Sequence, residues 1–285
     1  MAEVLSCDGA PDLRRVFARA LTGTRRGGSS TLPDVVGERR GVVVDPAGVV
    51  DYAHTCGFTV GPHPPMTWPH LLGFPLQAAV MSRRDFPLAM VGLIHVTNRI
   101  TWTRPLEYGE SLDVSVHATD LRTHRRGRAV DLVAEVSSRD VVVWRGVSTY
   151  LARGGGDEAM ASDGPPDVAD LVPRAITQMR FAEDAGRRYA SVSGDVNPIH
   201  LHALSARAFG FHRAIAHGMF SYARVLASLG ARLPAAGSST VWFRKPVTLP
   251  STARLAVSDD ARLVVLVPAR GSGEHLVATV TPTTL

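Results

Sequence analysis

The stretch SGDVNPIHLH, from Ser193 to His202, gathers ionisable and hydrogen-bonding side chains around a proline. A connecting loop needs turn-forming residues such as glycine, asparagine and proline, but it has no need of two histidines. Asp195 and His200 are five residues apart across a turn that Pro198 fixes, so a carboxylate and an imidazole can converge on one water. Asn197 is the candidate that orients them, through the loop backbone or a substrate amide. The pattern indicates acid–base chemistry, with a solvated loop carrying incidental histidines as the alternative.

These histidines are also candidate ligands of a metal ion. His200 and His202 form an HxH pair, which some metal sites use, but such sites need further carboxylate or histidine ligands. The next ionisable side chains along the chain are Arg207 and then His212, with no Asp or Glu. We therefore expect no metal here, and we expect His202 and His212 to be loop residues.

Composition places the chain among ordinary globular proteins. Its 285 residues are 45% hydrophobic and 20% charged, with a formal charge of +5. The basic residues occur in scattered pairs, unlike a nucleic-acid-binding surface, although a mildly basic surface suits a phosphate-bearing or acidic partner. Cys7 and Cys56 have no CxxC spacing, which argues against a disulfide framework or thiolate metal site. Because no apolar leader or membrane-length apolar run is present, we expect a cytoplasmic protein without a membrane span.

The two halves of the chain resemble each other. Pro105 matches Pro246 at a spacing of 141 residues, and Tyr52 matches Tyr189 at a spacing of 137 residues. Two collinear matches at similar spacing indicate a duplicated fold. A stretch rich in Gly, Pro, Asp and Ala separates the halves and is typical of a linker. The predicted organisation is an N-terminal tail (1–31), a first copy (32–152), a linker (153–173) and a second copy (174–285).

Each copy has the same predicted order of elements. A short strand comes first, then a turn-rich helical stretch, an apolar helix, and several strands rich in Val, Ile and Thr. The helix GMFSYARVLASLGARL, which begins at Gly218, is apolar nearly all round, and this indicates burial on every side. A buried helix wrapped by an antiparallel sheet is an α+β arrangement, and two copies could pack as an internal pseudo-dimer.

The motif that runs from Tyr189 to His200, followed by HGM at 217–219, carries a family resemblance. It resembles the hydratase-2 signature of MaoC-like dehydratases, Y-x-x-x-[ST]-G-D-x-N-P-[IL]-H. Residues 32–285 further resemble mycobacterial MaoC-like (3R)-hydroxyacyl-thioester dehydratases, which are double hotdogs. The resemblance implies interconversion of (3R)-3-hydroxyacyl and trans-2-enoyl thioesters in fatty-acid metabolism, without a cofactor. It assigns catalysis to Asp195 and His200.

Adding water to an enoyl thioester places negative charge on the thioester oxygen, so the site needs hydrogen-bond donors. Gly218 lies in the first turn of the predicted helix, where backbone N–H groups are unpaired and a missing Cβ permits close approach. The resemblance gives the oxyanion role to a backbone N–H here. Ser193, His217 and Met219 are further substrate-binding candidates, and His217 is also interpreted as packing beside Gly218. A plain helix start is the alternative for HGM alone.

The first copy departs from the motif. Phe58 and Val60 stand where the second copy has Asp195 and Asn197, and His63 lies opposite His200 without an acidic partner. This copy is predicted to be catalytically inactive. Its prolines are expected to break or shorten the helix and leave room for an acyl chain. The candidates for lining this acyl tunnel, which could instead simply fill the core, are Met66, Trp68, Leu71, Leu72 and Phe74.

Two rival functions remain. A hotdog thioesterase usually carries a carboxylate on its central helix, and residues 218–229 have none. A non-catalytic acyl-binding partner of a dehydratase would not need Asp195, Asn197 and His200. The expected substrate is an acyl thioester of coenzyme A or of acyl carrier protein, and the expected assembly is a monomeric pseudo-dimer or a homodimer.

Overall fold

The computed structural model describes residues 2–7, 9–22, 30–160 and 164–283. The chain divides into two compact units. The first unit comprises Met1–Asp45 and Met66–Asp163, and the second comprises Pro46–Pro65 and Gly164–Leu285. Among the described residues, no helix combines the length and apolarity that crossing a bilayer requires.

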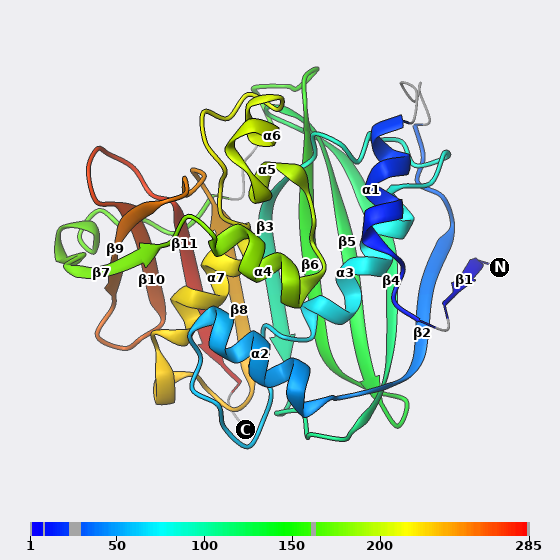
Figure 1. Cartoon of the computed structure of the whole chain (residues 1–285), viewed down its shortest axis with the longest axis horizontal. Helices are drawn as coiled ribbons and strands as arrows, with labels where there is room; N and C mark the ends of the chain where they lie inside the picture. Colours follow the sequence, from blue (N-terminus) through cyan, green and yellow to red (C-terminus); the bar gives the residue numbers. More distant parts are fainter. Residues whose placement is uncertain (1, 8, 23–29, 161–163, 284–285) are drawn as a thin grey trace. The chain divides into compact units, whose positions relative to one another are not determined.

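The first unit is a helix packed on a long-stranded sheet (Figure 1). In spatial order, its strands are β1 (Glu3–Ser6), β2 (Val35–Val43), β4 (Ser111–His124), β5 (Gly127–Ser138), β6 (Val141–Arg153) and β3 (Ile94–Trp102). All neighbours are antiparallel except β1 and β2. Helix α3 (His70–Met81) packs against β2, β4 and β5. A Cβ on Gly73 would lie 2.8 Å from the Ala134 Cβ, so glycine permits this close approach.

The second unit repeats this layout with shorter strands. In spatial order they are β7 (Thr177–Phe181), β9 (Ser251–Val257), β10 (Leu263–Pro268), β11 (Leu276–Pro282) and β8 (Gly237–Phe243), all antiparallel. Its helices are α2 (Pro46–Cys56), α4 (Ala185–Ser193), α5 (Pro198–Leu201), α6 (Ala203–Arg207) and α7 (Gly218–Ala227). Phe220 of α7 meets Phe181 of β7 edge-on, and Tyr222 donates a hydrogen bond to Ser239 of β8. Helix α7 is therefore held on this sheet.

The predicted duplication is confirmed element by element. In both repeats a strand, a helix and a buried helix precede four antiparallel strands, in the same spatial order. Tyr52 of α2 and Tyr189 of α4 are both buried, and their ring centroids are 6.4 Å apart. Gly57 and Gly194 follow these helices with φ of 82° and 71°, a conformation that favours glycine. The α+β double-hotdog prediction is confirmed.

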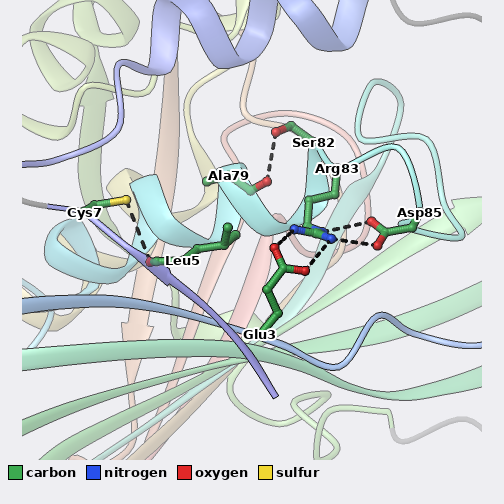
Figure 2. Close-up of polar contacts among 7 residues, drawn as sticks. All are labelled: Glu3, Leu5, Cys7, Ala79, Ser82, Arg83 and Asp85. Atoms are coloured by element: carbon green, nitrogen blue, oxygen red, sulfur yellow. Dashed lines mark hydrogen bonds and ion pairs between the residues drawn. The ribbon is translucent and has the colours of Figure 1, made fainter. Parts of the chain in front are cut away.

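The observed units differ from the predicted boundaries at the N-terminus. Within the predicted tail, 1–31, β1 pairs in parallel with β2, and α1 (Leu13–Thr22) follows it. Figure 2 shows the Arg83 guanidinium bonded to both Glu3 and Asp85, at distances of 2.8 to 3.0 Å. Pairing to a strand more than 30 residues away leaves no local pattern in the sequence, so this segment could not be distinguished from a tail.

Two further boundaries differ. Residues 46–65 belong to the second unit, although in the chain they lie between two segments of the first unit. In the predicted linker, 153–173, Val168 and Leu171 are buried in a core cluster with Val265 and Val277. Residues 161–163 of that linker lie outside the described part of the chain. Two apolar side chains three residues apart did not indicate a packed segment, because the surrounding residues are mostly Gly, Pro and Asp, which are typical of a linker.

The expectation that prolines shorten the first-half helix is wrong. Helix α3 has 12 residues and α7 has 10. Pro69 occupies the position before the helix, where no backbone N–H is needed for an intrahelical bond. Pro75 lies inside α3, which continues past it to Met81 because six of its side chains around and after Pro75 are buried in the unit. Tertiary packing outweighs the local cost of the proline.

Candidate active site

A glycine turn after α4 begins the candidate site. Gly194 adopts a left-handed conformation, and its N–H donates to the Ala190 carbonyl at 2.9 Å. The buried Ser193 hydroxyl donates to the Tyr189 carbonyl at 2.8 Å and accepts a bond from the Asp195 N–H at 3.2 Å. Ser193 thus ties the end of the helix to the first residue of the turn.

Hydrogen bonds within the loop fix the carboxylate. Asp195 Oδ1 accepts from the Asn197 N–H at 3.1 Å, and Asn197 Oδ1 accepts from the Ile199 N–H at 3.4 Å. The His200 N–H donates to the Asn197 carbonyl at 3.0 Å. Asn197 is therefore bonded to the loop backbone at the start of α5, where Pro198 occupies the first helical position without needing a donor.

Gly186 is a residue that the motif analysis did not single out. A Cβ at this position would lie 1.8 Å from the His200 carbonyl oxygen. Helix α4 therefore approaches the backbone of α5 more closely than any side chain permits. Since His200 is carried on α5, this contact sets where its imidazole lies. A glycine eight residues before Gly194 was the only signal in the sequence.

Two buried histidines complete the cluster. His200 Nδ1 donates to the Ile215 carbonyl at 2.8 Å, and its ring stacks on that of His217 with centroids 3.7 Å apart. His217 Nε2 donates to the Asp195 carbonyl oxygen at 3.0 Å and lies 3.7 Å from Asp195 Oδ2. His217 thus joins Asp195 and His200, a grouping that 22 residues of sequence separation concealed.

Burial controls the charge of these groups. Burial, and next the neighbouring His217, lowers the pKa of His200 to about 3, against the opposing influence of Asp195. Burial lowers the pKa of His217 to about 4. Burial also raises the pKa of the Asp195 carboxyl, although His200 and the Asn197 N–H oppose that shift. Both imidazoles are therefore neutral near neutral pH, and the carboxyl is a weaker acid than usual.

The hydrogen bonds then define which ring nitrogens carry protons. A carbonyl oxygen only accepts, so neutral His200 is protonated on Nδ1 and has its lone pair on Nε2. Such a nitrogen can take a proton from water. The Asp195 side chain is 18% exposed and that of His217 only 3%, so the carboxylate is the more accessible of the two. The arrangement can activate one water and return a proton nearby.

The N-terminus of α7 provides backbone donors. Its first-turn N–H groups have no intrahelical acceptors, and the helix dipole is positive there. Gly218 begins the helix directly after His217, and a Cβ on Gly218 would lie 3.1 Å from the Phe243 ring. The close packing of Phe243 is thus a second explanation for glycine at this position. Met219 follows and is buried.

The acyl-tunnel candidates lie in the first unit, apart from this cluster in the chain. Trp68 and Leu72 are buried, whereas Met66, Leu71 and Phe74 keep part of their surface accessible. Leu71, Leu72 and Phe74 lie on α3, and Met66 and Trp68 lie just before it.

A metal ion is geometrically conceivable at the cluster. One ligand atom from each of Asp195, His200 and His217 lies within 4.8 Å of the others. The expectation of no metal was based on the lack of a third ligand near His200 and His202, and that reasoning is wrong because His217 supplies one. His202 is exposed and does not belong to the cluster.

Known proteins share both the sequence and the fold of this chain. The model of the MaoC-like domain family matches residues 166–262. The chain is 39% identical to 3-hydroxyacyl-thioester dehydratase X of Mycobacterium tuberculosis over 251 residues, which is 88% of this chain and 89% of that protein. The crystal structure of M. tuberculosis HtdX superposes with a TM-score of 0.76 at 37% identity, covering 87% of this chain and all of that one. A MaoC-like dehydratase from Phytophthora capsici shares the fold, with a TM-score of 0.68 at 16% identity over 87% of this chain and 95% of that chain. Because it is 39% identical to the M. tuberculosis dehydratase over 88% of its own length, the protein belongs to the MaoC-like dehydratase family.

Proposed function

We propose that the second unit interconverts (3R)-3-hydroxyacyl and trans-2-enoyl thioesters at Asp195 and His200. The protein is a hydro-lyase of fatty-acid metabolism by its family membership. The observation that supports the residue assignment is the buried cluster of one carboxyl and two neutral imidazoles beside the N-terminus of α7.

In the hydration direction, the Asp195–His200 pair accepts a proton from water while the water oxygen adds to C3 of the enoyl group. The pair then returns a proton to C2. The lone pair on His200 Nε2 suits it to the first transfer, and the raised pKa of Asp195 suits its protonated form to the second. Dehydration follows the same steps in reverse.

The charge that develops on the thioester oxygen is stabilised by backbone N–H groups in the first turn of α7, around Gly218 and Met219. His217 holds the Asp195 backbone through its Nε2 hydrogen bond and packs against the His200 ring. Ser193 and Asn197 support the turn from either side of Asp195.

The substrate carrier is coenzyme A or acyl carrier protein, which present the same phosphopantetheine thioester. We also propose that the acyl chain contacts the first-unit residues that keep accessible apolar surface, which are Met66, Leu71 and Phe74. Trp68 and Leu72, which are buried, are the less accessible candidates. Burial of each methylene contributes roughly 0.8 kcal/mol at most.

Hydration of crotonyl-CoA tests the assignment against both rivals. Purified protein should remove the enoyl-thioester absorbance and form the (3R) product, while a thiol reagent detects no free coenzyme A. Release of free thiol would identify a thioesterase. An unchanged absorbance with both crotonyl-CoA and crotonyl-carrier protein, from folded protein, would identify a non-catalytic binding subunit and contradict the proposal.

A further inference from the structure

A surface cavity of about 190 Å³ opens in the second unit, outside the Asp195 cluster. Helix α2 contributes His54 and Thr55 to its lining, the end of β7 contributes Arg180, α4 contributes Arg188, and α7 contributes Phe220 and Arg224. No Asp or Glu lines it. Its volume is several times the roughly 30 Å³ that one water molecule occupies in the liquid, so it holds more than a single solvent molecule.

Arg224 is the most enclosed of the three arginines. Its guanidinium lies 4.9 Å from the Phe181 ring centroid and 5.7 Å from that of Phe220. One of its N–H groups donates to the Arg180 carbonyl. The ring contacts and this bond fix the plane of the guanidinium, which carries five N–H donors in all.

Neutralising groups beside Arg224 are scarce. Burial, and to a smaller extent Arg188, lowers the pKa of Arg224, and only Cys56 among the titrating groups acts in the opposite direction. Burial raises the pKa of the Cys56 thiol to about 12, so this thiol is uncharged at neutral pH. Among the described residues, none of the ion pairs within 4 Å involves Arg180, Arg188 or Arg224.

Stabilisation of the α2 C-terminus is the simplest alternative role for these cations. His54 and Thr55 belong to the last turn of α2, where the helix dipole amounts to about half a negative charge. Three guanidinium groups exceed that charge several-fold. Glu183 and Asp184 are close in sequence, but neither lines the cavity. An unbalanced positive charge around a concave site favours a multiply charged anion.

We propose that this cavity binds a phosphate group. Guanidinium groups bind phosphate oxygens through paired N–H bonds, and a cavity lined by three arginines and by no acidic residue suits a tetrahedral dianion better than a single carboxylate. The phosphate belongs either to a ligand that also carries a pantetheine arm or to a separate phosphate-bearing molecule. The inference does not depend on the proposed enzyme activity.

Calorimetric titration of the full chain with inorganic phosphate and with adenosine 3′,5′-bisphosphate, at constant ionic strength, tests the proposal. Saturable binding should weaken at least about tenfold in Arg188→Gln and in Arg224→Gln. Arg188 is exposed, so its variant should fold normally even if loss of the Arg224 stacking lowers stability. The matched control is Arg232→Gln, an exposed arginine that does not line the cavity.

The source of the phosphate is separated by titrating coenzyme A and pantetheine in the same variants. Coenzyme A binding that weakens in both cavity variants, with pantetheine unaffected, assigns the site to the phosphates of the carrier. Coenzyme A binding that is unchanged while inorganic phosphate binding weakens assigns it to a separate ligand. Absence of saturable binding by either phosphate probe, or equal binding in the cavity variants and the control, overturns the proposal.

Discussion

The turns that follow α2 and α4 share a beginning and differ in what comes after it. Both helices carry a buried tyrosine and end before a glycine with positive φ. Phe58 then follows Gly57, whereas Asp195 follows Gly194. The backbone turn is thus a property of the fold, and the chemistry depends on the few side chains placed on it.

The starts of α3 and α7 extend the contrast. Helix α7 begins with Gly218 after His217, so its first backbone N–H groups are approachable. Helix α3 begins with His70 after Pro69, and the His70 side chain is buried. The first repeat therefore has a buried side chain at the helix start where the second repeat has a glycine without one.

Each unit nevertheless contains a pair of stacked histidines. His70 and His95 stack at 6.4 Å in the first unit, and His200 and His217 stack at 3.7 Å in the second. Only the second pair has a carboxylate, that of Asp195, among the described residues within ligand-atom reach. Two neutral imidazoles alone form a polar contact, and the added carboxyl of Asp195 is what provides an acid–base site in the second unit.

The largest expected effect comes from removing that carboxyl or its imidazole partner. Asp195→Asn and His200→Gln should each lower kcat at least about a hundredfold, because each removes a proton-transfer group. His63→Gln, at the corresponding position of the first repeat, should keep full activity. If the pair acts as one unit, the double variant should be little worse than either single variant. Losses that multiply in the double variant of a folded enzyme would contradict a shared mechanism.

A smaller effect is expected from Gly186→Ala. Its Cβ would overlap the His200 carbonyl, so α4 and α5 must separate, at a cost of about 1–3 kcal/mol in the free energy of unfolding. Activity should fall as well, because His200 moves with α5. Urea unfolding and the crotonyl-CoA assay measure the two consequences. Gly61→Ala is the matched control, since a Cβ there meets nothing within 4 Å, and equal stability of both variants would show that the contact is unimportant.

Gly186 also shows where prediction from sequence succeeds and where it fails. The matching position of α2, judged by the tyrosines, is Val49, which is fully buried. Repeat matching, the helix periodicity and the ordered motif predicted the duplicated α+β fold and the Asp195 turn. A close contact between two backbones is visible in the sequence only as a glycine. Many glycines are required for other reasons, such as turns, so the contact could not be predicted.

Contacts between residues far apart in the chain could likewise not be predicted from the sequence. The approach of His217 to Asp195 depends on how α7 docks, and the parallel pairing of β1 with β2 depends on a strand far along the chain. The prolines of the first repeat misled for the opposite reason. Pro69 precedes α3 at no cost to the helix, and the local cost of Pro75 inside α3 is outweighed by burial of the helix.

The pH dependence of stability should reflect both histidine pairs. Burial lowers the pKa of His70 to about 4 and of His95 to about 3, and His200 and His217 behave alike. Below about 6.5 the unfolded chain therefore binds protons that the folded chain does not, and stability falls as the pH drops. Between pH 6.5 and 5.5 each such histidine should cost about 1 kcal/mol.

Urea unfolding at these two pH values measures the effect in variants of each pair. His95→Phe and His217→Phe should each reduce the pH dependence by one histidine's share, and only His217→Phe should reduce activity. The raised pKa of Asp195 acts in the opposite sense, because the stability it contributes at low pH is lost as the pH rises through its folded value. Stability that rises on acidification from pH 6.5 would show that the carboxyl outweighs the histidines.

Acyl-chain length should have a milder effect, through the first unit. If the accessible apolar residues of α3 contact the chain, kcat/KM should rise from C4 to at least C8 enoyl thioesters, by at most about 0.8 kcal/mol per methylene. Phe74→Trp should reduce activity on the C8 substrate far more than on crotonyl-CoA. Val141→Trp, at an exposed position of the same unit, is the control. A flat profile, or one that peaks at C4, would restrict the first unit to a structural role.

No effect at all is expected from removing metal ions. His200 and His217 could offer ring nitrogens to a cation together with Asp195, so the geometry alone does not decide the matter. The proposed chemistry, however, uses the His200 Nε2 lone pair as a base, and a bound cation would occupy it. Enzyme dialysed exhaustively against EDTA should therefore keep its full crotonyl-CoA hydration rate, and added Zn²⁺ should inhibit it by competing for that nitrogen. His202→Gln, outside the cluster, should respond to Zn²⁺ as the wild type does. Activity that collapses with EDTA and returns with a divalent ion would reverse the comparison, because the second unit would then differ from the first by a metal centre and not by a proton relay.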